Sequence, residues 1–375
     1  MKPDFLARAC LAAAAFSPAM QAGAAPVELT GPGMPAHIAQ LSQGPGGTLC
    51  IVGQVPGAQG ASRKRGLVIL FDMAKNAVRW QRMVDAPGND AQTAFVACHT
   101  DGRTVLVGAD VEVHGRVVAH AWRFDENGDP AAPVPLVGTS GDAHVLAIDA
   151  DAGGVTVAGM TRAASEGRQS SALFFARLDP ALRGAAVDRL PTGAYLPGSA
   201  AKLAGNTLYL GGNFAPATAT AQAVPDDYAV SKIVGGKYRF SLRPHTLPAA
   251  DVASAISFDN DIVSLGHAGT TTTLAAVDAN GRAKDRLQFR STFCTTGSMG
   301  ADAGTVYAVR WLCGNAREPA VLVAIDRKTG AELIVSGIVG EPVAVQLAGT
   351  QVVVVARKSN GSLLLQAVDK GQEPD

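Results

Sequence analysis

The sequence predicts an all-β protein, a single seven-bladed β-propeller of four-stranded antiparallel blades. Three observations support this prediction: a repeated pair of apolar strands, a regular spacing between the repeats, and a spare strand near the amino end. Repetition comes first, because a period of about 20 to 50 residues indicates a solenoid or a propeller. No segment sustains the 3.6-residue apolar period of an amphipathic helix, so we expect sheets throughout.

Each repeat opens with two short apolar strands joined by a turn that contains Gly or Asn. Residues 94–98 with 104–108, and 145–148 with 155–159, show this pattern clearly. The second strands of the pairs are expected to begin near Leu49, Val105, Val155, Leu208, Ile262, Val306 and Val352. Their spacing of roughly 44 to 56 residues suits four-stranded blades with loops of variable length.

A third strand follows each pair and often ends in an apolar residue followed by Asp, as in Phe124-Asp125 and Ile325-Asp326. The aspartate then opens a tight turn, because its carboxylate accepts hydrogen bonds from the next backbone amides. Asn-Gly steps such as Asn280-Gly281 adopt positive φ easily and suit the same hairpins. A more polar fourth strand, for instance residues 283–289, completes the unit.

The last unit ends after its third strand, at Val368-Asp369, while Pro26–Thr30 offers an extra strand at the other end of the chain. Pairing the two would close the ring and protect both exposed sheet edges. A missing strand matched by a spare one favours seven blades over six or eight.

The first 24 residues have the pattern of a signal peptide. Lys2 and Arg8 precede a short apolar run, and Ala22-Gly23-Ala24 supplies the small residues of a cleavage site. The apolar run is shorter than the about 20 residues that span a bilayer. We therefore expect a signal peptide at residues 1–24, a propeller domain at residues 25–375, no membrane insertion, and a periplasmic or secreted location.

Four cysteines remain after residue 24, and an oxidising compartment favours two disulfides, although four cysteines allow three pairings. Cys294 falls in the link that enters the sixth blade and Cys313 follows the second strand of that blade, so they can meet on one face. Cys50 and Cys98 fall near the opposite face in adjacent blades. The expected pairs are Cys294–Cys313 and Cys50–Cys98.

Basic and acidic residues are equal in number, 32 of each. A protein that neutralises many phosphates normally carries a basic excess. The sequence therefore predicts no nucleic-acid partner.

Two blades carry the residues of a known repeat. Gly153–Gly159 followed by Phe174–Pro180 resembles a delta-60-type propeller repeat, and Arg103–Gly108 followed by Ala121–Gly128 is similar. The fourth blade departs from it, with Ile233-Val234-Gly235 in place of the apolar-Asp step. The resemblance implies a bacterial-type propeller and no activity, because a fold alone does not determine a function.

Five residues are candidates for an axial ligand site. Asp90, Asp142 and Asp251 precede the first strands of three blades, where links face the mouth of a central channel. Three carboxylates there could hold a divalent cation or a basic ligand group, whereas the alternative is that each caps its own turn. His37 and His144 occupy equivalent places and could share a metal or an acid–base role, or serve as hydrogen-bonded structural histidines.

No catalytic signature is present: there is no Gly-x-Ser-x-Gly elbow, and no catalytic residue or cofactor beyond a divalent cation is predicted. Loops at residues 54–65, 161–171 and 213–227 are expected on one face, and such loops commonly carry binding. We expect a non-enzymatic binding or scaffold module for a protein or glycan partner. Two alternatives stay open, a metal-dependent hydrolase or lyase that uses the axial pocket and a periplasmic immunity or inhibitor protein.

Overall fold

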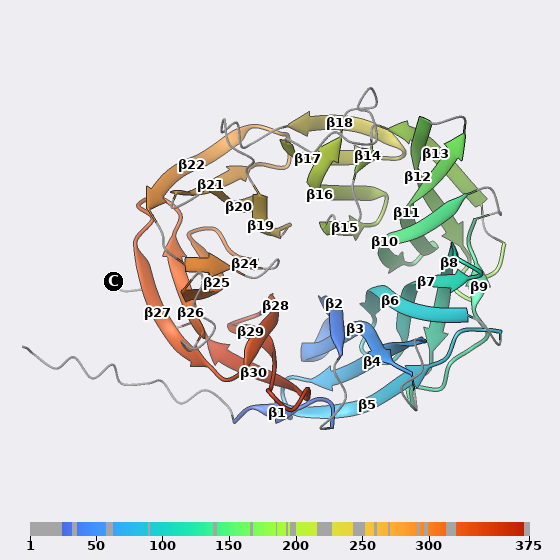
Figure 1. Cartoon of the computed structure of the whole chain (residues 1–375), viewed down its shortest axis with the longest axis horizontal. Coiled ribbons are helices and arrows are strands. Elements are labelled where there is room, and N and C mark those ends of the chain that lie inside the picture. The colour runs from blue at the N-terminus through green and yellow to red at the C-terminus, as the bar shows by residue number, and fades with distance from the viewer. Residues whose placement is uncertain are drawn as a thin grey trace, which may run out of the picture.

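Seven β-sheets stand side by side in a ring around a central axis (Figure 1). The computed structural model describes residues 25–31, 36–57, 63–88, 91–137, 141–165, 168–184, 186–192, 194–195, 200–215, 227–242, 252–258, 261–268, 271–290, 293–295, 299–312 and 320–370. The predicted signal peptide lies outside these residues. Helical structure within them is confined to one 3-10 turn, Pro45–Gly47, and no helix among them is long and apolar enough to cross a membrane.

The first three blades follow the chain order, with the innermost strand first. Blade 1 contains β2 (His37–Gln43), β3 (Thr48–Pro56), β4 (Lys64–Asp72) and β5 (Ala77–Val84). Blade 2 contains β6 (Ala91–Thr100), β7 (Val105–Val113), β8 (Arg116–Phe124) and β9 (Val134–Pro135). Blade 3 contains β10 (Asp142–Asp151), β11 (Gly154–Ser165), β12 (Arg168–Leu178) and β13 (Ala186–Thr192).

Blade 5 has the same order as blades 1 to 3, and blades 4 and 6 differ from them only in that the innermost strand is divided in two. Blade 4 contains β14 (Ala194–Tyr195), β15 (Ala200–Ala204), β16 (Thr207–Ala215), β17 (Asp227–Val234) and β18 (Lys237–Leu242). Blade 5 contains β19 (Val252–Ser257), β20 (Ile262–Ala268), β21 (Thr271–Val277) and β22 (Ala283–Arg290). Blade 6 contains β23 (Phe293–Thr295), β24 (Gly300–Ala301), β25 (Thr305–Leu312), β26 (Ala320–Asp326) and β27 (Glu332–Ile338).

Blade 7 confirms the predicted ring closure. It contains β28 (Glu341–Ala348), β29 (Gln351–Arg357) and β30 (Leu363–Asp369), and its outermost strand is β1 (Val27–Glu28) from the amino end. The seven second strands begin at the predicted residues or one residue earlier. Leu29 donates its backbone N–H to the Leu363 carbonyl at 2.8 Å, and Thr30 Oγ1 accepts from Leu363 N at 2.8 Å.

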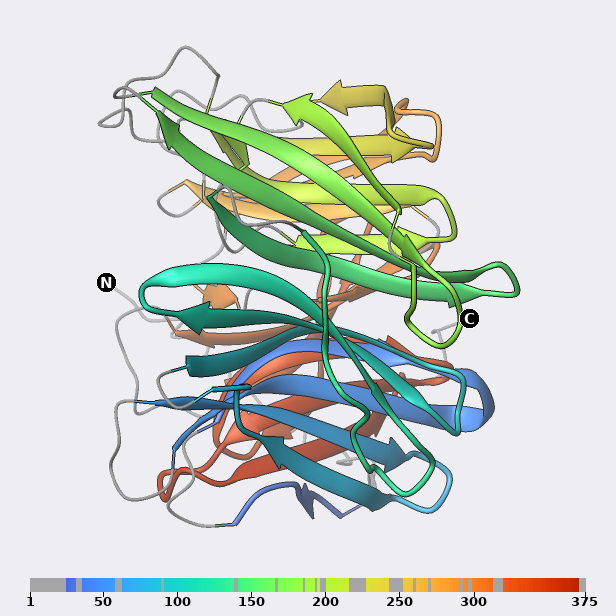
Figure 2. The same cartoon turned by 90° about the vertical axis from the view of Figure 1, so that its right-hand side faces the viewer.

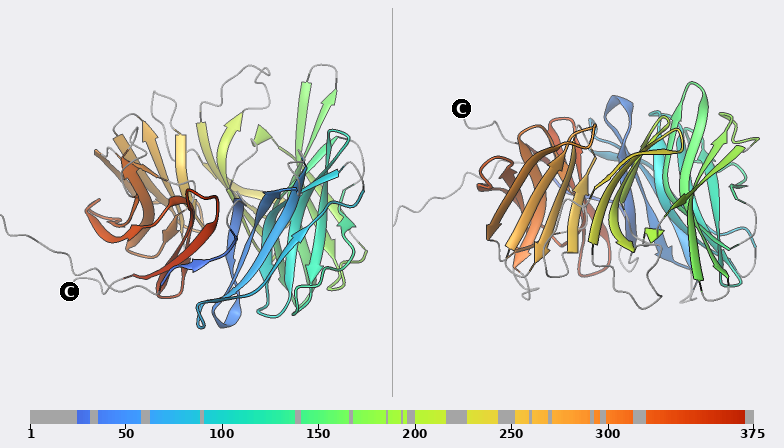
Figure 3. Two further views of the ribbon diagram at one scale, coloured as in Figure 1. Left: turned by 60° about the horizontal axis from the view of Figure 1, so that its bottom comes forward. Right: turned by 90° about the horizontal axis from the view of Figure 1, so that it is seen from above.

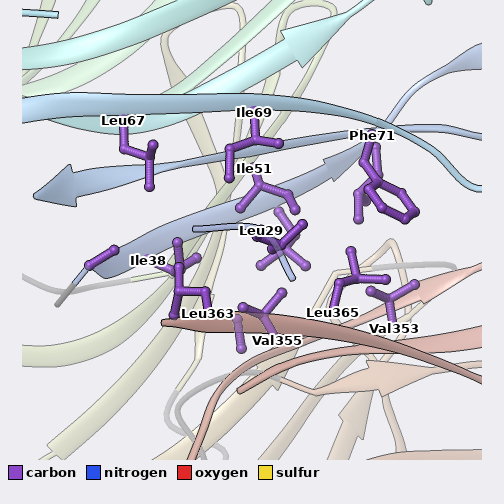
Figure 4. Packing of buried hydrophobic residues seen from close by; sticks show 14 of the residues in the cluster. Leu29, Ile38, Ile51, Leu67, Ile69, Phe71, Val353, Val355, Leu363 and Leu365 are labelled. Atoms are coloured by element: carbon purple, nitrogen blue, oxygen red, sulfur yellow. The ribbon is translucent and has the colours of Figure 1, made fainter. Parts of the chain in front are cut away.

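Residues 27–30, which join the amino end to blade 7, form a latch that is anchored by burial as well as by hydrogen bonds. Leu29 is 2% exposed and packs among side chains of blades 1 and 7, including Ile38, Ile51 and Leu365 (Figure 4). Apolar area removed from water contributes about 25 cal/mol per Å², so this side chain stabilises the closure substantially.

Two faces of the ring are distinguished by which connections they carry. The link face bears the loops between second and third strands and the links between blades, and the turn face bears the other turns. The β7–β8 and β11–β12 hairpins reach to the same side of the ring, the link face (Figure 2). The predicted loop at residues 161–171 is wrong: β11 and β12 stay paired out to Ser165 and Arg168, so the chain continues there as a hairpin of two strands.

The predicted aspartate turns close the hairpins of the turn face. Asp125 Oδ1 accepts hydrogen bonds from Asn127 N and Asp129 N, at 2.9 and 2.8 Å, and Gly128 has a φ of 82°. Asp179, Asp278 and Asp326 make the same kind of bonds. Backbone amides that donate to these carboxylates hold the pKa of each of the three below its ordinary value.

A bulge recurs in the innermost strand of five blades, near the link face. It interrupts the pairing of β2, β6, β10, β19 and β28 with their neighbours. The residue opposite its first member is small in each case, because the chains approach closely. A Cβ on Gly53 would lie 2.0 Å from the His37 carbonyl oxygen, and one on Gly159 would lie 2.4 Å from that of His144.

One of the two predicted disulfides lies in the described part of the chain. Cys50 in β3 and Cys98 in β6 are bonded and buried between blades 1 and 2. Cys294 belongs to β23, but Cys313 and the side chain of Cys294 lie outside the described residues, so the Cys294–Cys313 pair stays a prediction.

Candidate functional site at the boundary of blades 2 and 3

The best-defined cluster of polar side chains joins blade 2 to blade 3 near the link face. Asp110 lies in β7, within an otherwise apolar strand, and its side chain points towards blade 3. Its Oδ2 contacts His144 Nδ1 at 2.8 Å, and its Oδ1 accepts from Val145 N at 2.8 Å. Val145 begins the bulge of β10, so the irregular backbone supplies a donor that a regular strand would pair within its own sheet.

This contact orients His144. A carboxylate only accepts hydrogen bonds, so Nδ1 donates to Asp110 and Nε2 is the nitrogen left for another partner. Both side chains are partly buried, with His144 27% exposed and Asp110 20% exposed. An imidazole that is oriented by a carboxylate can accept a proton or a hydrogen bond at Nε2, or bind a metal there.

Asp142 also reaches back to blade 2. Its Oδ1 accepts from Val117 N, in β8, at 3.1 Å, and its strand partner in β11 is Arg162. The structure thus brings two of the five sequence candidates, Asp142 and His144, to one blade boundary, where each bonds to the preceding blade. Asp90 and Asp251 lie outside the described residues.

His37 occupies the register position of His144 but has a different neighbour. Both histidines stand directly before the first residue of the bulge. Asp110 belongs to blade 2, the blade before that of His144. The corresponding position in blade 7, the blade before that of His37, holds Arg357. A guanidinium does not accept hydrogen bonds, so a matching pair cannot form and His37 is exposed.

Two further polar residues extend the cluster towards the link face. Gln92 Nε2 donates to Glu112 Oε2 at 2.8 Å, and these residues pair across β6 and β7. Sequence reasoning missed Asp110, Glu112 and Gln92, because it looked for function in the links. Asp110 and Glu112 do leave a signal, since they are two charged residues at alternate positions of a strand that is otherwise apolar.

A second histidine–aspartate pair joins the same two blades near the turn face, with the roles reversed. His99 of blade 2 contacts Asp149 of blade 3, Nδ1 to Oδ1, at 2.8 Å, and Gly205 N of blade 4 donates to Asp149 Oδ2 at 2.7 Å. Burial opposes the ionisation of Asp149, but the bonds from His99 and Gly205 outweigh it, so its pKa lies below the ordinary value.

Blades 5 and 6 are joined on the turn face by a buried cation. Arg327 is 3% exposed and binds Asp261 at 2.9 Å and Asp285 at 2.7 Å. Its Nη1 donates to the Asp302 carbonyl at 2.7 Å, and Lys284 also contacts both oxygens of Asp261. These charges are paired between blades, which indicates that they hold the ring together rather than bind a ligand.

The part of the chain that the structure describes contains no group of three His, Cys, Asp or Glu side chains placed to hold a metal ion. The cluster at blades 2 and 3 therefore offers one oriented imidazole beside carboxylates. Asp110, Glu112 and Asp142 lie close to Arg162, the strand partner of Asp142, so charges of both signs meet here.

Comparison with models of known protein families gives no match, and no curated protein matches the chain. The delta-60-type resemblance therefore stays a prediction. Solved structures do resemble it. The β-propeller domain of the Trilobed protease from Pyrococcus furiosus is 13% identical, over 92% of this chain and 96% of that one, with a TM-score of 0.54.

Two enzymes show a similar likeness. Virginiamycin B lyase from Staphylococcus aureus is 11% identical over 92% of this chain and 98% of its own, with a TM-score of 0.53. An acylaminoacyl peptidase is 9% identical over 91% of this chain, also with a TM-score of 0.53. This chain spans about half the length of the acylaminoacyl peptidases that it matches, 49% and 52%. At these identities the likeness establishes the propeller fold alone.

Proposed function

We propose that this chain is an exported binding module that recognises a protein or glycan partner through its link face. The expected signal peptide supports the export, which puts the chain in the periplasm or outside the cell. A protein partner could equally be a toxin that the module neutralises, as expected of an immunity protein.

The observation that carries the proposal is the length of the β11–β12 hairpin. The two strands have 12 and 11 residues, whereas the other second and third strands have 7 to 9. Gly159 and Ala109 occupy the same position in their blades, opposite the bulge. Past this position β11 continues for six residues, whereas β7 continues for four. At about 3.3 Å per residue, the hairpin stands clear of its neighbours by one or two residue pairs. Figure 3 shows it rising above the ring.

A projecting hairpin on a rigid ring suits recognition rather than stability. The backbone ladder orders this extension, because β11 and β12 stay paired out to Ser165 and Arg168. Rigid presentation lowers the entropy lost on binding, which favours affinity for a partner. The polar cluster below it, which includes Asp110, Glu112 and Asp142 together with Arg162, would supply charged groups for a polar partner.

Shortening the hairpin tests the proposal directly. Arg162 and Ser171 are register partners, so residues 163–170 can be replaced by an Asn-Gly turn that keeps the remaining ladder. We expect unchanged melting and loss of binding to the natural partner, recovered from the host's exported fraction, or to glycans on an array. Full retention of that binding would contradict the proposal.

Photo-crosslinking on one blade supplies the matched control. A photoreactive residue at His114, the exposed tip of β7–β8, samples the link face, whereas one at Glu126 samples the turn face of the same blade. The partner should crosslink to the first variant and not to the second. Crosslinking only at Glu126 would place recognition on the other face.

A second candidate, a metal-dependent hydrolase or lyase, is favoured by the His144–Asp110 contact alone. Stoichiometric divalent metal in protein purified from its own host, lost in His144→Ala but not in His37→Ala, would support the enzyme. Its absence from both would favour the binding module.

A further inference from the structure

The outermost strand of blade 6 differs from every other outermost strand in its surface chemistry. Among the described residues, large exposed apolar side chains are few, and three of the five belong to β27 or the residue after it: Leu333 (62% exposed), Ile334 (66%) and Val339 (57%). Consecutive strand residues point to opposite sides, so both sides of this edge are apolar. Figure 1 shows β27 on the outer rim of the ring.

Outermost strands are edges, and edges usually carry features that prevent further pairing. Charged side chains, proline and short length all do this. The other strands have such features: Arg79 and Arg82 in β5, Asp188 and Arg189 in β13, Lys237 and Arg239 in β18, Lys284 and Arg286 in β22, and only two residues each in β9 and β1. β27 is seven residues long, contains no proline and has one charge, Glu332.

That single charge is already paired. Glu332 Oε1 accepts from the guanidinium of Arg310, which is fully buried in β25. The rest of the strand is neutral, and its outer edge pairs with no described strand. An apolar, uncharged edge of this length is a template for another strand, and it costs solubility when left open.

We propose that β27 is the interface of a symmetric dimer, in which the edges of two copies of this chain pair antiparallel. A second copy fits because the strand is complementary to itself. A two-fold axis normal to the joined sheets keeps each side chain on its own side, so opposed residues differ by an even number of positions. With the axis at Ile334, Ile334 faces Ile334 of the second copy.

Electrostatics agree with this pairing. Glu332 is the single charge of the strand and lies two positions from the axis, so no like charges meet across the edge. A partner edge built like β5, β18 or β22 would instead bury lysine or arginine against apolar side chains, which costs free energy. β27 has a bulge at Val335, as β5, β18 and β22 have in their own pairings, and it adds twist and shortens the segment that can pair, so we expect a weak dimer.

The arrangement has a consequence for binding. The two-fold axis is normal to the blade 6 sheet and so reverses the direction of the propeller axis. The two link faces of the dimer therefore point in opposite directions, and a dimer could bridge two partners.

Sedimentation velocity over about 1 µM to 500 µM tests the dimer with the exported, purified chain. We expect a concentration-dependent dimer in the wild type, and a Kd at least about tenfold higher in Ile334→Lys, which installs the charge that other edges carry. Val187→Lys is the matched control, because Val187 is 36% exposed on β13, an outermost strand that already carries charged side chains. It should leave the Kd unchanged.

Oxidative crosslinking identifies the contact itself. Directly opposed residues of an antiparallel pair have Cβ atoms about 5 Å apart, within reach of a disulfide. Ile334→Cys should give a covalent dimer and Val187→Cys should not. A wild type that stays monomeric over the whole range, or a dimer that Ile334→Lys leaves unchanged, would overturn the proposal.

Discussion

Removing the latch between the chain ends should open blade 7 before the rest of the ring. Thr30→Ala deletes the hydroxyl that accepts from Leu363 N, and Leu29→Ala deletes a fully buried side chain of the same segment. Glu28→Ala is the control, because Glu28 is exposed and lies on the same short strand.

The magnitudes follow from what each change leaves behind. Thr30→Ala leaves a buried N–H without its acceptor, at a cost of about 1 to 3 kcal/mol. Leu29→Ala removes apolar contact and creates a cavity, at a cost of about 2 to 5 kcal/mol. Glu28→Ala should change stability by less than about 0.5 kcal/mol.

Hydrogen exchange measures this locally. Opening of the latch exposes the amide of Leu363, so a loss of about 1 to 3 kcal/mol should speed its exchange by about 5- to 150-fold in Thr30→Ala. Amides of β7 in blade 2 should keep their wild-type rates. Thr30→Ser restores the acceptor and should restore the protection. If the Leu363 amide exchanged at the wild-type rate in both Thr30→Ala and Leu29→Ala, the conclusion that the latch holds blade 7 closed would be refuted.

Three further changes probe the contacts between blades. Cys98→Ala opens a crosslink across 48 residues and should destabilise the fold by about 4 kcal/mol, seen as a lower thermal midpoint that reducing agent shifts less than it shifts the wild type. Arg327→Met leaves half-buried Asp285 without this partner and buried Asp261 with Lys284 alone, so it should cost about 3 kcal/mol in denaturant unfolding, whereas Arg123→Met, which loses one exposed carbonyl contact, should cost under about 1 kcal/mol. Burial lowers the pKa of His120, so the unfolded chain binds more protons and stability should fall as the pH drops from about 6.5 to the pKa of the folded state. A second loss below about pH 4 comes from Asp149, whose pKa is also lowered, and His120→Gln should remove only the upper step in melting curves against pH.

The strand pattern was readable because each blade is a local structure. Its strands pair with their neighbours in sequence, so apolar runs, the aspartate turns and the Asn-Gly steps all act over a few residues. Even the closing strand could be predicted, since Val368-Asp369 leaves a unit incomplete and Pro26–Thr30 completes it.

The partners of the candidate residues could not be predicted, because they come from different blades. Asp142 and His144 were expected near the axis, which stays a prediction, and the structure adds that both bond to blade 2. His144 and Asp110 are 34 residues apart, and nothing local marks them as neighbours. Their contact also depends on a bulge at Val145, which no residue pattern in β10 announces.

By itself the sequence determined the number of blades, the starts of their strands and the way in which the ring closes, since these follow from hydrophobic pattern and turn chemistry within each unit. Only the tertiary structure decided which charges are paired between blades, that His144 has Asp110 beside it while the corresponding position in the blade before His37 holds Arg357, and that β27 is left as an apolar edge. These outcomes depend on the twist and packing of neighbouring sheets, which set side chains from distant parts of the chain within hydrogen-bonding distance.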